Sequence, residues 1–89
     1  MSLETYFNHP TFGLLLLICP LGNGQELFTT LYAQRLFFLV KHNDAGMVVE
    51  PLSRGDARSL VEVQMRTLRR NGKIDAYKEV QDSYRRTFQ

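Results

Sequence analysis

Residues 31–40 carry an apolar side chain at almost every position. At the two-residue period of a β-strand they divide into two faces. One face carries Leu31, Ala33, Arg35, Phe37 and Leu39, and the other carries Tyr32, Gln34, Leu36, Phe38 and Val40. Because both faces are mostly apolar, such a strand is either buried on both sides, or buried on one side and available to a partner on the other.

Gln34 helps to choose between these alternatives. A glutamine side chain is unfavourable in fully apolar surroundings unless both ends of its amide are hydrogen-bonded. Its place between Tyr32 and Leu36 therefore favours a recognition surface over a core. The other alternative stays open, because a strand in the middle of a small barrel is covered on both sides if helices fold back over it.

Four further runs have the composition of short strands, at residues 4–7, 12–19, 26–30 and 47–50. The tripeptide Gly22-Asn23-Gly24 predicts a tight reversal, residues 41–46 a polar turn, and Pro51 the end of the last strand. Near residues 30–33 we expect either a bend that separates two strands or a kink in one long strand. About five short strands in so short a segment are typical of a small barrel or rolled sheet.

From Ser53 onward the periodicity is helical. Ser53 and Asp56 have the spacing of a capping box. The apolar side of the first expected helix carries Ala57, Leu60, Val61, Gln64, Met65 and Leu68. After a stop at Asn71-Gly72, Asp75 is expected to cap a second helix, whose apolar side carries Ile74, Tyr77, Val80, Gln81, Tyr84 and Phe88. The short link predicts an antiparallel pair, and the thin apolar stripe of the second helix predicts weak docking.

These elements define an α+β fold class with two parts. We expect a β domain over residues 1–52 and a C-terminal helical hairpin over residues 53–89. The first part has two basic against four acidic residues, and the second has nine against five. A domain of this size has a marginal core, so stabilisation by a partner is expected.

Cys19 is the single cysteine of the 89 residues, which excludes an intramolecular disulfide and favours a reducing compartment. Its apolar run is too short to span a bilayer, so we expect a cytoplasmic protein. No set of His, Cys, Asp and Glu residues has metal-ligand spacing, and His9 and His42 lie in turn-like segments. We therefore expect no enzyme, no catalytic residues, no metal and no cofactor.

One alternative function follows from the basic residues near the end of the first helix: Arg66, Arg69, Arg70 and Lys73. Basic residues at a helix C-terminus commonly do no more than complement the helix dipole. If Arg85 and Arg86 joined them on one surface, however, the helices could bind a nucleic-acid backbone. A small nucleic-acid-binding β-barrel is therefore the second hypothesis.

The chain also resembles a known family. Residues 8–15, 26–28, 31–40 and 57–70 are similar to PipX, the PII-interacting protein X of cyanobacteria, and the similarity covers nearly the whole chain. The resemblance implies a five-stranded Tudor-like β domain followed by two helices, without catalysis. It implies an adaptor and transcriptional co-activator in nitrogen and carbon regulation.

The resemblance also implies partners and site residues. Such proteins bind the trimeric signal protein PII when 2-oxoglutarate is low and ADP is high. When 2-oxoglutarate is high they bind the dimeric transcription activator NtcA, through an overlapping face. In this sequence that face includes Tyr32, Gln34, Leu36 and Phe38, with Arg35, Glu4 and Tyr6 as further members. No direct small-molecule ligand, membrane or DNA contact is implied.

Overall fold

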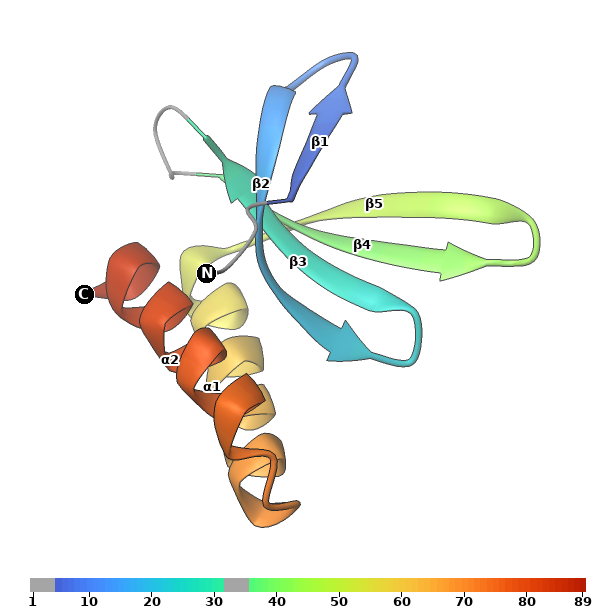
Figure 1. Ribbon diagram of the computed structural model, residues 1–89. Coiled ribbons are helices and arrows are strands. Elements are labelled where there is room, and N and C mark those ends of the chain that lie inside the picture. The colour runs from blue at the N-terminus through green and yellow to red at the C-terminus, as the bar shows by residue number, and fades with distance from the viewer. Residues whose placement is uncertain (1–4, 32–35) are drawn as a thin grey trace.

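A curled antiparallel sheet is followed by two helices in the computed structural model, which describes residues 5–31 and 36–89 (Figure 1). The strands, in the order of the sheet, are β1 (Tyr6–His9), β2 (Gly13–Gly22), β3 (Gln25–Thr30), β4 (Phe37–Asn43) and β5 (Gly46–Leu52). The helices are α1 (Arg54–Arg70) and α2 (Ile74–Phe88). The expected α+β class with five strands and a helical pair is confirmed.

The strand expected over residues 31–40 is shorter than predicted at its start and longer at its end. Leu31 lies in a turn, residues 32–35 fall outside the described part of the chain, and β4 begins at Phe37. Of the two alternatives, two separate strands is correct, since β3 ends at Thr30 and β4 begins at Phe37. Beyond residue 40, β4 continues because it pairs with β5 as far as Asn43, opposite Gly46.

The prediction of a tight turn and the prediction of a strand end have different outcomes. The reversal at Asn23 and Gly24 is confirmed, and both residues have positive φ, of 54° and 72°. Gly24 has a second constraint, because a Cβ there would lie 3.0 Å from the His42 carbonyl oxygen. The prediction that Pro51 ends the last strand is wrong. Pro51 lies inside β5, which tolerates it because β5 is an edge strand with one neighbour.

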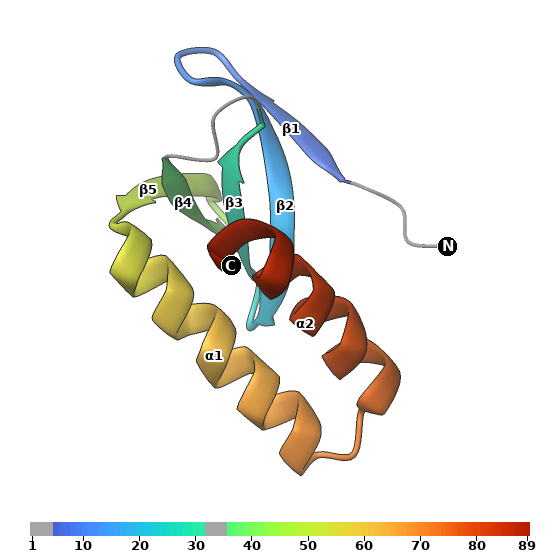
Figure 2. The same cartoon turned by 90° about the vertical axis from the view of Figure 1, so that its left-hand side faces the viewer.

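The sheet separates two clusters of buried apolar side chains. The first lies between the sheet and the helices (Figure 2) and contains Ile18, Cys19, Leu27, Phe37, Ala57, Val61, Val80, Tyr84 and Phe88. The second lies on the other face and contains Leu15, Phe28, Phe38 and Val40. β4 contributes to both, with Phe37 on the helix side and Phe38 on the opposite side. For residues 37–40, burial on both faces is therefore the correct alternative.

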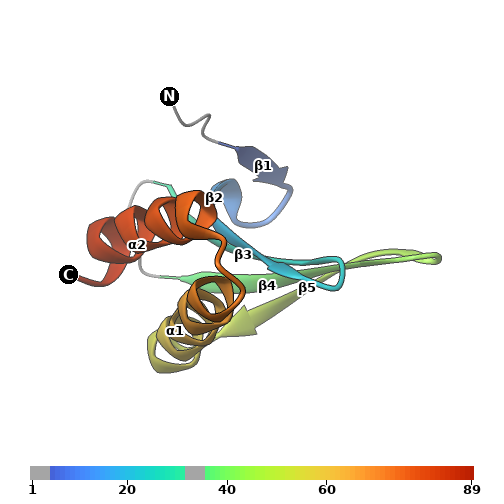
Figure 3. The same cartoon turned by 60° about the horizontal axis from the view of Figure 1, so that its bottom comes forward.

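The helices form the expected antiparallel pair, and together they cover one side of the sheet (Figure 3). Ser53 caps α1, and its Oγ accepts a hydrogen bond from the Asp56 N–H at 3.0 Å. The expected cap of α2 is wrong. Lys73 occupies the N-cap position and Asp75 lies in the first turn, where its charge still complements the helix dipole. Among the described residues, no helix is long and apolar enough to cross a membrane.

α2 is held to its neighbours by buried side chains from its middle to its C-terminal end. Val80, Tyr84 and Phe88 are buried, whereas Ile74, expected on the same side, is exposed. The Phe88 ring stacks on Phe37 with 5.4 Å between centroids. The Tyr84 hydroxyl accepts a hydrogen bond from Arg58 Nε at 2.8 Å and donates one to Glu62 Oε2 at 2.9 Å. The apolar stripe is thin, as expected, and a polar network on α1 supplements it.

Ser53→Ala should lower the free energy of unfolding by about 1 kcal/mol, because the Asp56 N–H loses its acceptor. Urea denaturation followed by circular dichroism measures this change. Ser59→Ala is the matched control, since Ser59 is an exposed residue in the interior of α1. Equal stability of Ser53→Ala and the parent chain would show that the Ser53 cap does not stabilise α1.

The Cys19 thiol should be unreactive in the folded protein. Burial raises its pKa to about 12, so the thiol stays protonated at neutral pH and the nucleophilic thiolate is scarce. Alkylation by iodoacetamide at pH 8 should therefore be at least about a hundredfold slower in buffer than in 6 M guanidinium chloride. Comparable rates in the two solutions would contradict the burial of Cys19.

Candidate partner-binding surface

Leu36 combines a fixed backbone with an exposed apolar side chain. Its carbonyl oxygen accepts two hydrogen bonds, from Thr29 Oγ1 at 2.9 Å and from the Thr30 N–H at 3.2 Å. Thr29 is fully buried, so these bonds tie Leu36 to the interior of the sheet. The Leu36 side chain is nonetheless 50% exposed. A large apolar side chain on an ordered backbone loses little entropy when a partner buries it.

Phe38 is expected to form part of the partner surface, but it is buried in this structure. Its side chain is only 2% exposed and belongs to the second buried cluster. The Phe12 ring packs on it with 4.7 Å between centroids. Phe38 is buried because β4 lies between two neighbours and its even-numbered face points into the curl of the sheet. In this structure Phe38 lies in the interior with Phe12 packed on it, and it exposes almost no area of its own.

Phe12 is the residue that the sequence reasoning missed. It was expected inside a strand, but it lies in the turn between β1 and β2 and is 43% exposed. His9 orders this turn, because its Nδ1 accepts hydrogen bonds from the Thr11 N–H at 3.0 Å and the Phe12 N–H at 3.2 Å. His9 therefore has a local structural role at this turn. The Pro10 turn signal could have placed Phe12 outside the strand.

Tyr6 lies on a different face of the sheet from Phe38. The strand register pairs Tyr6 with Leu16, Leu16 with Thr29 and Thr29 with Phe37. Paired residues share a face, so Tyr6 belongs to the face of Phe37, which carries the helices. Its side chain is 46% exposed. The remaining expected site residues, Glu4, Tyr32, Gln34 and Arg35, lie outside the described residues.

The basic residues of the helices do not form one surface. Arg66, Arg69 and Arg70 lie at the end of α1, close to the link with α2. Arg85 and Arg86 lie in the last turn of α2, beside the start of α1, because the pair is antiparallel (Figure 2). About ten residues of helix separate the two groups, or roughly 15 Å along the axis. The condition on which the nucleic-acid alternative depends, that the two groups share one surface, is not met, and this weakens that alternative.

Leu36 and Phe12 each offer exposed apolar contact area on an ordered backbone. In the part of the chain that the structure describes, no group of three or more His, Cys, Asp or Glu side chains could hold a metal ion. A small α+β protein with an ordered, exposed apolar surface has the features of a protein-interaction module.

Comparison with known proteins identifies the family. The family model PipX, PII-interacting protein X, matches residues 3–88. The chain belongs to this family and is thus a PII-interacting protein. No curated protein gives a significant match.

Proposed function

We propose that this protein is an adaptor and transcriptional co-activator that links PII to NtcA in nitrogen and carbon regulation. The observation that carries the proposal is Leu36, whose apolar side chain is half exposed although its backbone is fixed. Membership of a family defined by interaction with PII supports the first partner. The second partner, the NtcA dimer, follows from the resemblance described above.

The shared face is proposed to centre on Tyr32, Gln34 and Leu36, with Arg35 and Glu4 as further contacts. Tyr6 lies on the helix side of the sheet and is proposed as a contact that the partner reaches around the side of the sheet. Phe38 acts beneath it as a supporting residue, because it is buried. Tyrosine and leucine supply contact area, and the Gln34 amide can pair with exposed backbone of an extended loop. A single face of this kind makes the two complexes mutually exclusive.

The effectors act through the partners in this proposal. PII binds the adaptor when 2-oxoglutarate is low and ADP is present, and releases it when 2-oxoglutarate and ATP are high. NtcA loaded with 2-oxoglutarate then takes up the free adaptor and is held in its active form. Because linkage through the conformation of each partner suffices, 2-oxoglutarate has no need to touch this chain.

Titration calorimetry with purified PII tests the proposal. We expect saturable binding in the presence of ADP and at least tenfold weaker binding with ATP and 2-oxoglutarate. Binding that is insensitive to the effectors would contradict the adaptor function.

A gel-shift assay with the protein alone addresses the nucleic-acid alternative. The adaptor should give no shift, whereas a nucleic-acid-binding protein should give one that weakens steeply with salt.

α2 is proposed to occupy more than one position, docked in the free protein and displaced in some complexes. Its docked position depends mainly on Val80, Tyr84 and Phe88, and its first half contributes little burial. Hydrogen exchange of the amides of α2, measured with and without PII, tests this. Equal protection in the free and bound protein would contradict the proposed movement.

A further inference from the structure

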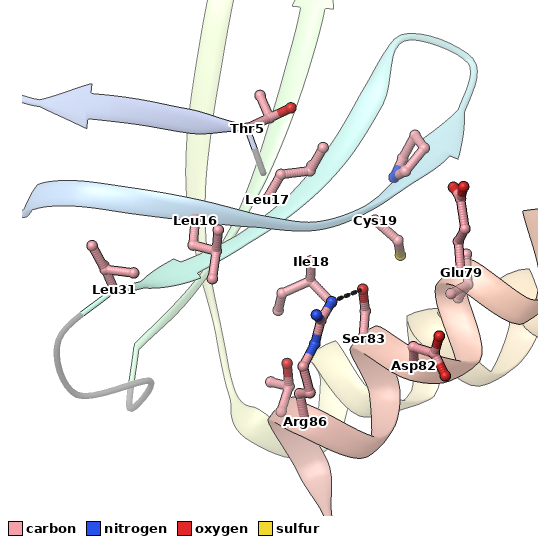
Figure 4. Close-up of a pocket in the computed structure, with 13 residues that line it drawn as sticks. Thr5, Leu16, Leu17, Ile18, Cys19, Leu31, Glu79, Asp82, Ser83 and Arg86 are labelled. Atoms are coloured by element: carbon pink, nitrogen blue, oxygen red, sulfur yellow. Dashed lines mark hydrogen bonds between the residues drawn. The ribbon is translucent and has the colours of Figure 1, made fainter. Parts of the chain in front are cut away.

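A groove of about 360 Å³ lies between β2 and α2 (Figure 4). Its floor comes mainly from β2, with Leu16 and Ile18 in the middle and Leu31 at one end. Leu16 and Leu31 are only partly buried, so apolar area remains uncovered beside the helix. The volume is at the lower end of the range for ligand sites and suits one or two side chains.

The α2 wall of the groove has an excess of negative charge. Glu79 and Asp82 are exposed, and neither forms an ion pair with any residue that the structure describes. Arg86, at the other end of this wall, donates a hydrogen bond to Ser83 Oγ at 3.2 Å. Figure 4 shows Glu79 on the side of Cys19, and the Arg86 side chain beside Ile18 and Ser83. A positively charged group is therefore favoured at the Glu79 end.

Within residues 5–31 and 36–89, part of the β2 edge beside the groove has no neighbouring strand. β1 pairs with β2 only as far as Leu16, and the last bond described runs from the Leu17 N–H to the Thr5 carbonyl at 2.9 Å. From Ile18 to Gly22, β3 is the only neighbour of β2 within residues 5–31 and 36–89. Such an edge can accept an extended backbone by main-chain hydrogen bonds.

We propose that this groove binds an extended peptide segment of a partner protein that carries an aliphatic side chain next to a lysine or arginine. The aliphatic side chain lies on Leu16, Ile18 and Leu31, and the cation lies beside Glu79 and Asp82. The segment lies along β2. This site differs from the surface around Leu36, and it exists only while α2 is docked.

Binding in the groove should also stabilise the docked position of α2. Its two walls belong to β2 and α2, so an occupant contacts both. A ligand that binds only where both walls are present stabilises the docked position of α2. The amides of α2 should therefore exchange more slowly when the groove is occupied.

The test uses the whole ¹⁵N-labelled protein and the acetylated, amidated peptide Lys-Val-Leu-Val-Lys. At low salt we expect saturable chemical-shift changes centred on Ile18, Val80 and Ser83. The double variant Glu79→Gln, Asp82→Asn should bind the peptide about three- to tenfold more weakly, because two exposed charges are removed without change of shape. Asp44→Asn, at the tip of the hairpin between β4 and β5, is the matched control and should bind as the parent does.

Several results would overturn the proposal. One is the absence of saturable shifts, and another is equal binding of Glu-Val-Leu-Val-Glu. Shifts centred on Phe12 and Leu36 would place the peptide on the other surface. Butylamine binding in the groove as tightly as the peptide would make the site one for small amines.

The variant Ser83→Leu narrows the groove. It should abolish peptide binding, while its spectrum should remain that of a folded protein.

Discussion

Leu36→Arg should weaken the complex with PII by about 2 kcal/mol or more, or roughly 30-fold, while the protein stays folded. The half-exposed side chain contributes little to the core, so its loss has a small effect on stability. In the complex, the arginine would replace buried apolar contact with a charge that needs hydration. Titration calorimetry in the presence of ADP measures the change. Tyr32→Ala is expected to have a similar effect.

Val63→Arg is the matched control for this experiment. Val63 has the same 50% exposure as Leu36 but lies in the middle of α1, whereas Leu36 directly precedes β4 in the sheet. It should bind PII as the parent chain does. If Leu36→Arg bound PII as tightly as Val63→Arg, Leu36 would not belong to the partner surface.

Phe37→Ala should lower the free energy of unfolding by about 3–5 kcal/mol, a large part of the stability of so small a protein. The Phe37 side chain is 1% exposed and packs in the cluster shared by the sheet and both helices. Its removal leaves the Phe88 ring without its stacking partner. Urea denaturation measures the loss, and hydrogen exchange should show that α2 becomes unprotected first.

Phe38→Ala is the informative comparison, because Phe38 is equally buried but belongs to the cluster on the other face. We expect a loss of similar size with no selective exposure of α2. Equal loss of α2 protection in both variants would contradict the separation of the core into two clusters.

The fold could be predicted where local signals agree. Glycines with an asparagine between them gave the hairpin at Asn23, and Ser53 with Asp56 gave the start of α1. Element limits were less accurate because pairing decides them. β4 extends through the polar residues 41–43 since β5 lies opposite, and Pro51 is accepted inside β5 since that strand has a free edge.

The candidate site could be predicted only in part. Alternation along residues 31–40 gives two apolar faces but does not say which neighbour covers each one. The curl of the sheet buries Phe38, and the Phe12 ring packs on it. The alternation along residues 31–40 predicts neither the curl nor this ring contact. Leu36 is exposed because it lies just before β4 begins, a boundary set by pairing with β3 and β5.

The central claim, one face shared by two partners, is tested most directly by competition. The protein carries a fluorophore on a cysteine introduced at Asp44, and it is bound to PII in the presence of ADP. NtcA is then added with 2-oxoglutarate at a level that leaves PII–ADP binding intact when NtcA is absent. Fluorescence anisotropy and size-exclusion chromatography should show full displacement of PII, with no ternary complex. A stable complex of all three proteins would contradict the shared face.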